Sequence, residues 1–79
     1  MKYDKDKVDE IVLALMYLNI FQDGPGIRAW KGFDWEALER LHEEGYISDP
    51  KGKAKSIVVT EEGMRRSEEL FRKHFGKTV

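Results

Sequence analysis

A glutamate and a histidine three positions apart, Glu39 and His42, have the spacing at which one turn of a helix presents two ligands to a metal ion. Bundles that hold a di-metal centre use such a Glu-x-x-His pair twice, on two helices. This chain has one copy, and His42 and His74 are expected on the apolar flanks of their helices, where a histidine is more often a core residue. Cysteine is absent, so thiolate ligands are excluded. We therefore expect no metal and no cofactor.

Catalytic patterns are also missing from the sequence. Ser48, Ser56 and Ser67 have no evident base, and no phosphate-binding glycine loop or pair of catalytic carboxylates stands out. A chain of 79 residues buries only about 60% of its unfolded surface, which leaves little room for a cleft. We expect one domain, residues 1–79, that is not an enzyme and has no small-molecule substrate.

Three lysines, Lys51, Lys53 and Lys55, alternate around a predicted turn and could reach phosphate groups. Three such contacts release about three counterions, so binding at physiological salt would be weak. The alternative is that these lysines protect an exposed strand edge from aggregation. The helix before the turn is acidic on its outward side, where Arg40 is the one base. Nucleic-acid contact through Lys51, Lys53, Lys55 and Arg40 is therefore a secondary hypothesis.

Residues 28–35 interleave bases with aromatic rings, as proteins that bind single-stranded nucleic acid do. The members of this group are Arg28, Trp30, Lys31, Phe33 and Trp35. The alternative is that Trp30 and Phe33 fill the core, because a small core gains most from large rings. The sequence leaves both possibilities open.

The first predicted helix is apolar on two sides. One stripe, at helical spacing, consists of Val8, Ile11, Val12, Leu15 and Leu18. We expect the last helix and the central helix to cover it. A second group on the opposite side consists of Leu13, Met16, Tyr17 and Ile20. Either residues 27–33 fold over this group or a second copy of the chain does. We therefore predict a homodimer interface at these four residues.

Turn and cap residues divide the chain into an α+β pattern. A first helix is expected from Asp4 or Asp6 to about Phe21, ended by residues 23–26, and an extended segment over residues 27–33. A second helix is expected to begin at Asp34 and to end at Gly45. Two short strands, 46–48 and 57–59, flank a turn with proline and glycine. Thr60 is expected to cap a last helix over residues 61–75.

Charge and hydropathy favour a cytoplasmic protein. The formal net charge is −1, which gives the whole chain no overall attraction to nucleic acid. The N-terminal residues are charged from the start and contain no secretory apolar segment. The longest apolar run, residues 11–18, is far shorter than the roughly 20 residues of a membrane span. We expect no membrane association.

The run from Leu41 to Gly63 resembles the wing region of bacterial winged-helix regulators of the MarR and PadR type. In those families a recognition helix ends in glycine, a β-hairpin follows, and Thr-x-x-Gly begins a C-terminal helix. The matching residues here are Leu41, Gly45, Tyr46, Ile47, Thr60 and Gly63. The resemblance implies a small winged helix-turn-helix-like domain with three main helices and a hairpin wing. Its second helix is reduced or missing, because residues 27–33 are too short for one.

A second resemblance covers most of the chain. Residues 28–35, RAWKGFDW, together with residues 47–56, ISDPKGKAKS, are similar to a small uncharacterised bacterial domain family, which implies no known activity. The leading hypothesis is therefore a non-enzymatic protein-interaction module that forms homodimers through its first helix. The alternative is a bacterial transcriptional regulator that contacts DNA mainly through the lysine-rich wing.

Overall fold

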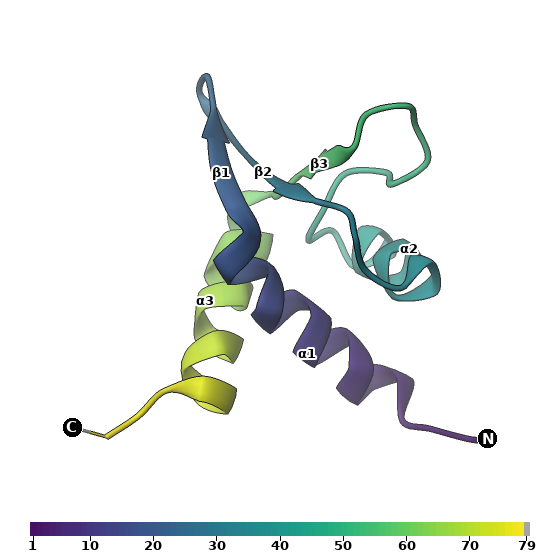
Figure 1. Ribbon diagram of the computed structural model, residues 1–79, viewed down its shortest axis with the longest axis vertical. Helices are drawn as coiled ribbons and strands as arrows, with labels where there is room; N and C mark the ends of the chain where they lie inside the picture. The colour runs from purple at the N-terminus through teal and green to yellow at the C-terminus, as the bar shows by residue number, and fades with distance from the viewer. Residues whose placement is uncertain (79) are drawn as a thin grey trace.

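The computed structural model describes residues 1–78, over which the chain forms three α-helices and one three-stranded antiparallel sheet (Figure 1). The elements are α1 (Lys5–Met16), the 3-10 turn η1 (Tyr17–Asn19), β1 (Ile20–Asp23), β2 (Gly26–Trp30), α2 (Trp35–Glu43), β3 (Ser56–Val58) and α3 (Glu61–Phe75). The strand order is β1-β2-β3. In Figure 1 the sheet lies above, and α1 and α3 diverge below it. The predicted α+β class and three helices are confirmed.

Each helix begins where its capping residue predicts. The carboxylate of Asp4 accepts a hydrogen bond from the Lys7 backbone N–H at 3.1 Å. Asp34 accepts one from Ala37 at 3.1 Å, and the Thr60 hydroxyl accepts one from Gly63 at 3.0 Å. Each bond satisfies a backbone donor that a helix start leaves unpaired. Short side chains of this kind therefore set the starts of all three helices.

The end of α1 at Met16 differs from the expected end near Phe21. The Tyr17 backbone N–H donates to Ala14, so the Leu13 carbonyl loses its helical partner. The Ser67 hydroxyl of α3 donates to this carbonyl at 2.7 Å inside the core. The chain then passes through η1 into β1. The apolar run 17–21 concealed the change, because short apolar stretches look alike in buried helices and strands.

Residues 23–26 form a hairpin turn between β1 and β2 rather than a helix stop. Asp23 pairs with Gly26, so Gly24 and Pro25 make a two-residue loop. Gly24 has a φ of +61°, as the first central residue of a type II′ turn requires. The extended segment expected from residue 27 is present as β2. This hairpin occupies the stretch between α1 and α2, where a second helix of a helix-turn-helix was expected to be reduced or missing.

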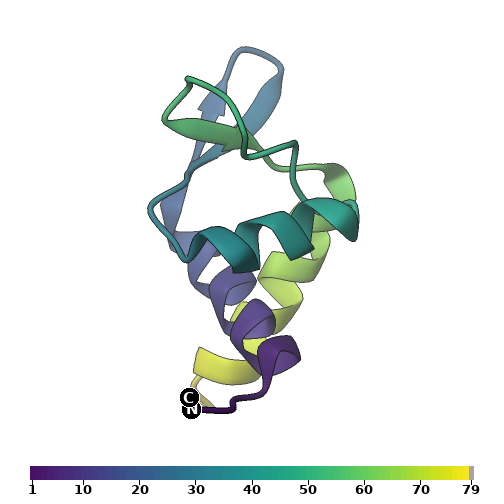
Figure 2. The same ribbon diagram turned by 90° about the vertical axis from the view of Figure 1, so that its right-hand side faces the viewer.

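The expected strand over residues 46–48 is reduced to one bridge, between Ile47 and Val59. The Ser48 hydroxyl accepts the hydrogen bond from the Val58 backbone N–H at 2.9 Å, which takes the place of a ladder bond. The opposite edge of β3 pairs with β2. Figure 2 shows the long loop that leads from α2 to β3 and the position of β3 beside β2. The predicted two-stranded wing is therefore mostly a loop, and β3 belongs to the sheet.

The core lies between the inner side of the sheet and the three helices. Its members are Val12, Leu13, Ala14, Met16, Ala29, Ala37, Leu38, Leu41, Ile47, Ile57, Val59 and Leu70. Every element except η1 and β1 contributes a fully buried residue to this cluster, and Ile20 of β1 packs against it from the side. Within residues 1–78, no helix combines the length and the apolar character that crossing a membrane requires.

Candidate functional site

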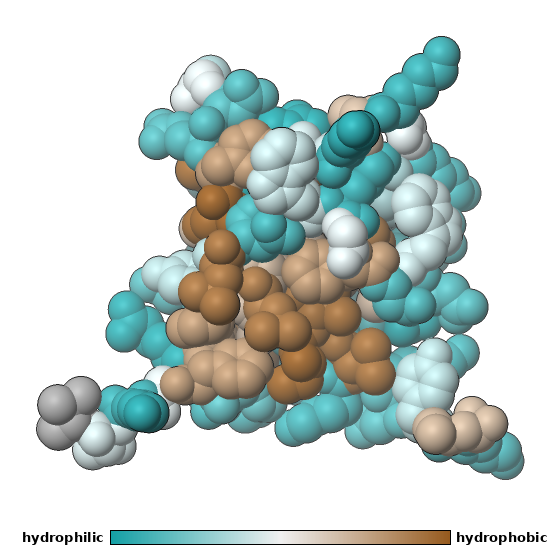
Figure 3. All heavy atoms as spheres, in the orientation of Figure 1, coloured by the Kyte–Doolittle hydropathy of each residue, from teal (hydrophilic) through white to brown (hydrophobic). Residues whose placement is uncertain are grey.

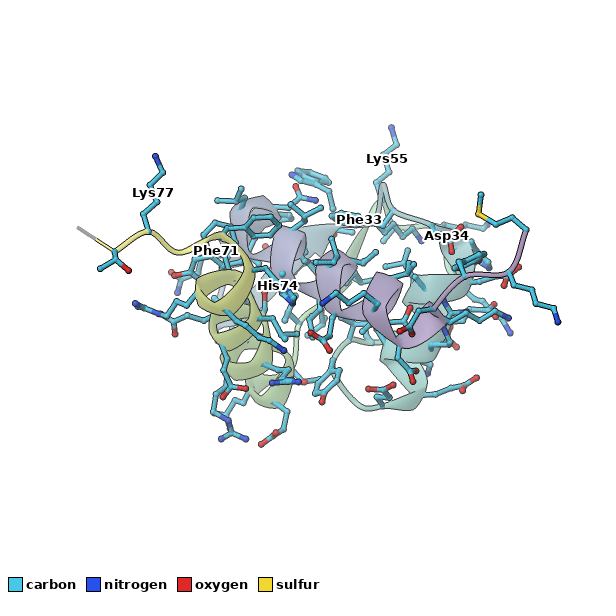
Figure 4. The ribbon with its side chains drawn as sticks, turned by 90° about the horizontal axis from the view of Figure 1, so that it is seen from below. Phe33, Asp34, Lys55, Phe71, His74 and Lys77 are labelled. Atoms are coloured by element: carbon cyan, nitrogen blue, oxygen red, sulfur yellow. The ribbon has the colours of Figure 1, made fainter. Side chains whose placement is uncertain are left out.

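The Glu39 and His42 pair does not converge on a common point with other ligands. The Nδ1 atom of His42 lies 3.0 Å from the Ile47 carbonyl oxygen, and Glu39 accepts a hydrogen bond from the Trp35 indole at 3.1 Å. The other histidine, His74, is turned toward α1 in Figure 4, where its Nε2 lies 2.9 Å from Glu10. Over the described residues, no three His, Asp, Glu or Cys side chains group so as to hold a metal ion.

Arg40 faces inward rather than toward a partner. Its guanidinium donates to both carboxylate oxygens of Asp9, at 2.7 and 2.8 Å. The Asp9 side chain is only 7% exposed and that of Arg40 is 23% exposed. The hydrogen bond with Asp9 raises the pKa of Arg40 above its usual range. Arg40 therefore ties α2 to α1, and its charge is already balanced by Asp9, so it is a weaker candidate for nucleic-acid contact than the loop lysines.

The three lysines lie where the sequence places them, on the exposed loop between Pro50 and Ser56. Lys51 lies 4.0 Å from Glu39, at the limit of an ion pair. Lys53 and Lys55 form no ion pair with any residue that the structure describes. Figure 4 shows Lys55 extending away from the fold. Two of the three charges are therefore free to meet a partner.

The predicted dimer interface is wrong in its choice of face. Leu13 is 1% exposed and Met16 is fully buried, and both belong to the core of the single chain. Tyr17 packs on Phe71 with 5.1 Å between the ring centroids, and Ile20 is half-buried against the core. Leu13 and Met16 therefore cannot contact a second copy of the chain unless the first copy unfolds.

The buried stripe of α1 is Asp9, Val12, Leu13 and Met16, which has ordinary helical spacing. Because this stripe begins with a charged residue, Asp9, the stripe that contains Val8, Ile11 and Leu15 looked more apolar in the sequence. Asp9 is tolerated inside because Arg40 neutralises it. In the sequence, Arg40 is a basic residue on the next helix that can pair with Asp9. This possible pair was the signal that could have identified the Asp9 side of α1 as the buried side.

The stripe that was expected in the core is divided: Val12 is buried as expected, but the other four members lie toward the outer side of α1. Leu15 is 39% exposed and Leu18 is 71% exposed, while Val8 and Ile11 are half-buried. Val8 and Ile11 line a shallow hollow of about 410 Å³ together with Tyr3 and Val12. Figure 3 shows a hydrophobic area in the middle of this view, over α1 and its neighbours, with hydrophilic atoms around it. We call Val8, Ile11, Leu15 and Leu18 the α1 face.

A second exposed surface lies on the outer side of the sheet. Trp30 is 51% exposed and its ring stacks on Phe21 with 4.7 Å between centroids. Phe21 pairs directly with Arg28 across the strands, and Arg28 pairs with Val58. Phe33, by contrast, is half-buried against the core. The structure therefore separates the two rings that the sequence left open: Trp30 faces outward and Phe33 mostly inward.

Comparisons with known proteins identify a family without a described activity. Residues 4–77 match the family described as a domain of unknown function (DUF6429), and the chain belongs to this family. It is also 55% identical over 75 residues to the uncharacterised protein y4hR of Sinorhizobium fredii (strain NBRC 101917 / NGR234). The aligned residues make up 95% of this chain and 97% of the relative. No solved structure matches the chain. The two exposed surfaces are therefore the features of this chain that bear on its function.

Proposed function

We propose that this member of the DUF6429 family is a cytoplasmic, non-enzymatic interaction module that forms a homodimer through the α1 face. The observation that supports the proposal is the exposure of two leucines on one side of one helix, Leu15 at 39% and Leu18 at 71%. Contiguous exposed apolar side chains are unusual on monomers and mark interaction sites.

A second copy of the chain is the occupant that fits this face best. A two-fold dimer brings the same patch of both copies together, so the patch must complement itself. The α1 face consists of four apolar side chains, and the charged residues beside its hollow, Asp4 and Lys7, are of opposite sign. The net charge of −1 adds little repulsion between copies. A helical surface of this kind can pack on its own copy ridge against groove, with the exposed leucines of one copy beside the hollow of the other.

The expected affinity is moderate. Burying the exposed parts of Leu15 and Leu18 in both copies contributes roughly 4–6 kcal/mol. Association itself costs at least about 4 kcal/mol. The half-buried Val8 and Ile11, with the hollow beside Tyr3, must supply the remainder. We therefore expect a weak dimer, with a Kd on the order of a hundred micromolar, rather than a permanent one.

Sedimentation velocity between low and high micromolar concentration tests the proposal. We expect the wild type to shift from monomer to dimer, and the double variant Leu15→Glu with Leu18→Glu to stay monomeric and folded. Glutamate keeps helix propensity and places like charges opposite each other in the dimer.

Trp35→Glu is the matched control, because it removes an apolar side chain that is 46% exposed on a different helix. It should dimerise as the wild type does. A wild type that stays monomeric at several hundred micromolar, or a control that dissociates as completely as the α1 variant, contradicts the proposal.

The alternative function is DNA binding by a winged-helix-type regulator, with the loop of Lys51, Lys53 and Lys55 in the place of the wing. The freedom of Lys53 and Lys55 from ion pairs favours it. The outward side of α2 opposes it, because exposed Glu36, Glu43 and Glu44 would repel the phosphates of a duplex. A duplex is therefore included in the binding experiment below.

A further inference from the structure

We infer that the outer side of the sheet and the adjoining loop form a binding surface for single-stranded nucleic acid. We call this surface the sheet platform. It consists of Phe21, Arg28, Trp30, Lys31, Lys53 and Lys55. It lies on β1, β2, the residue that follows β2 and the loop before β3, so it is distinct from the α1 face and does not depend on dimerisation.

The aromatic part of the platform is exposed although the core of this chain is small. Trp30 is 51% exposed, and Phe21 supports its ring from one side at an interplanar angle of 29°. A tryptophan ring that a second ring supports on one side can offer its exposed part to an unpaired base for stacking. In a duplex the base faces are already stacked on one another, so this feature favours a single strand.

The cationic part of the platform is assembled from two distant segments. Residues 24–33 contain Arg28 and Lys31, residues 50–60 contain three lysines, and neither segment contains an acid. The Lys31 backbone N–H donates to the Lys55 carbonyl at 3.1 Å. The Lys31 ammonium donates to the carbonyls of Pro50 and Gly52 at 2.8 and 3.0 Å. These bonds hold the lysine loop beside the end of β2. The Lys31 ammonium also lies 5.8 Å from the centroid of the Trp35 ring, and Lys51 lies 4.0 Å from Glu39, so the outermost cations of the loop are Lys53 and Lys55.

Arg28 belongs to the same region. Its guanidinium donates to the Ser56 hydroxyl at 2.8 Å and to the Ser56 carbonyl at 2.9 Å. These neutral acceptors orient the group and leave its charge uncompensated. Arg28, Lys31, Lys53 and Lys55 form no ion pair within residues 1–78, whereas the arginines of α3 all pair with glutamates of the same helix.

This combination of charge and aromatic surface identifies the ligand class. Unpaired cations beside an exposed aromatic ring fit a phosphate backbone whose bases can turn onto the ring. Four unpaired cations exceed what the loop lysines provide alone, and they predict that log K falls with log salt at a slope near −3 for a single strand. An acidic protein partner would use the cations and leave Trp30 without a role.

Fluorescence anisotropy with labelled, mixed-sequence 12-nucleotide single strands of DNA and RNA tests the inference at about 50 and 200 mM salt. We expect micromolar binding at the lower salt and a slope near −3. Trp30→Ala should weaken binding about tenfold, while Trp30→Tyr should largely retain it, because any aromatic face can stack. Far-UV circular dichroism verifies that each variant is folded.

Lys53→Glu with Lys55→Glu should weaken binding and reduce the slope by about half. The matched control is Lys2→Glu with Lys5→Glu, which changes the net charge equally at the N-terminus, away from the sheet in Figure 1. It should bind nearly as the wild type does.

Absence of single-strand binding at the lower salt overturns the inference, and so does equal binding by wild type and Trp30→Ala. Tighter binding to a duplex of the same sequence also overturns it, and favours the alternative in which the loop lysines contact double-stranded DNA. The monomeric Leu15→Glu with Leu18→Glu variant is titrated in parallel, so that a failure of the dimer and a failure of the platform are distinguished.

Discussion

The carboxylate of Asp9 is enclosed between α1 and α2, and its charge is balanced by a single guanidinium. Asp9 is 5% exposed and accepts two hydrogen bonds from Arg40. A buried ion pair adds little net stability over apolar packing, but removing one partner leaves an uncompensated charge. The pair therefore has more influence on the orientation of α1 than on total stability, because it requires Asp9 to face α2.

We predict that Arg40→Ala destabilises the fold by about 2–3 kcal/mol, somewhat less than a fully buried pair, because the guanidinium is partly exposed. Arg65→Ala is the control. Its partner is Glu62, the two side chains are 69% and 62% exposed, and exposed pairs contribute at most about 1 kcal/mol. Urea unfolding followed by circular dichroism measures both. Equal midpoints for the two variants would show that Asp9 is solvated.

At the scale of elements, the start of α3 is fitted closely to the chain that follows α2. The Thr60 hydroxyl donates to the Gly45 carbonyl at 2.7 Å, and the Thr60 backbone N–H donates to the Tyr46 carbonyl at 3.1 Å. A Cβ atom at Gly63 would lie 2.0 Å from the Tyr46 carbonyl oxygen. Glycine at this position is therefore required by close approach, although it lowers helix propensity.

Gly63→Ala is accordingly expected to destabilise the protein by about 1–3 kcal/mol, although alanine favours a helix by about 1 kcal/mol. Gly52→Ala should have almost no effect, because nothing lies within 4 Å of a Cβ atom there. Thermal and urea unfolding of both variants provide the comparison. A Gly63→Ala protein at least as stable as the wild type would mean that α3 does not approach Tyr46 so closely.

Local signals predicted the helices better than the strands. Asp34 and Thr60 mark helix starts through hydrogen bonds that span three residues, so the sequence contains both partners. The strand β1 was missed because it is recognisable only through its pairing with β2, which depends on the turn between the two strands and on burial against residues far away in the sequence. The strand 57–59 was placed nearly correctly, but its main partner is β2 rather than residues 46–48. Strand pairing depends on long-range contacts, and a single sequence contains little information about them.

At the scale of the whole molecule, the α1 face and the sheet platform are the two surfaces on which function is proposed. If the α1 face forms a dimer, folding and association are linked, and thermal stability must depend on concentration. Raising the wild-type concentration a hundredfold through the micromolar range should add roughly 1 kcal/mol per protomer, which raises Tm by several degrees.

Calorimetry of the wild type and of the Leu15→Glu with Leu18→Glu variant, at matched concentrations, tests this dependence. The variant should have one Tm at every concentration, because a monomer has no association term. A concentration-independent wild-type Tm, together with a monomer in sedimentation, would exclude dimerisation through any face in this range.

The size, the α+β class, the helix starts, the absence of cysteine and the separation of acids from lysines along the chain all follow from the amino-acid sequence. These properties depend on composition or on contacts between neighbouring residues. The tertiary structure decided which side of α1 is buried, because that choice rests on Arg40 reaching Asp9 and on Ser67 reaching the Leu13 carbonyl. It also decided that Arg28 and Lys31 lie beside the loop lysines, because hydrogen bonds between β2 and the loop join segments far apart in the chain.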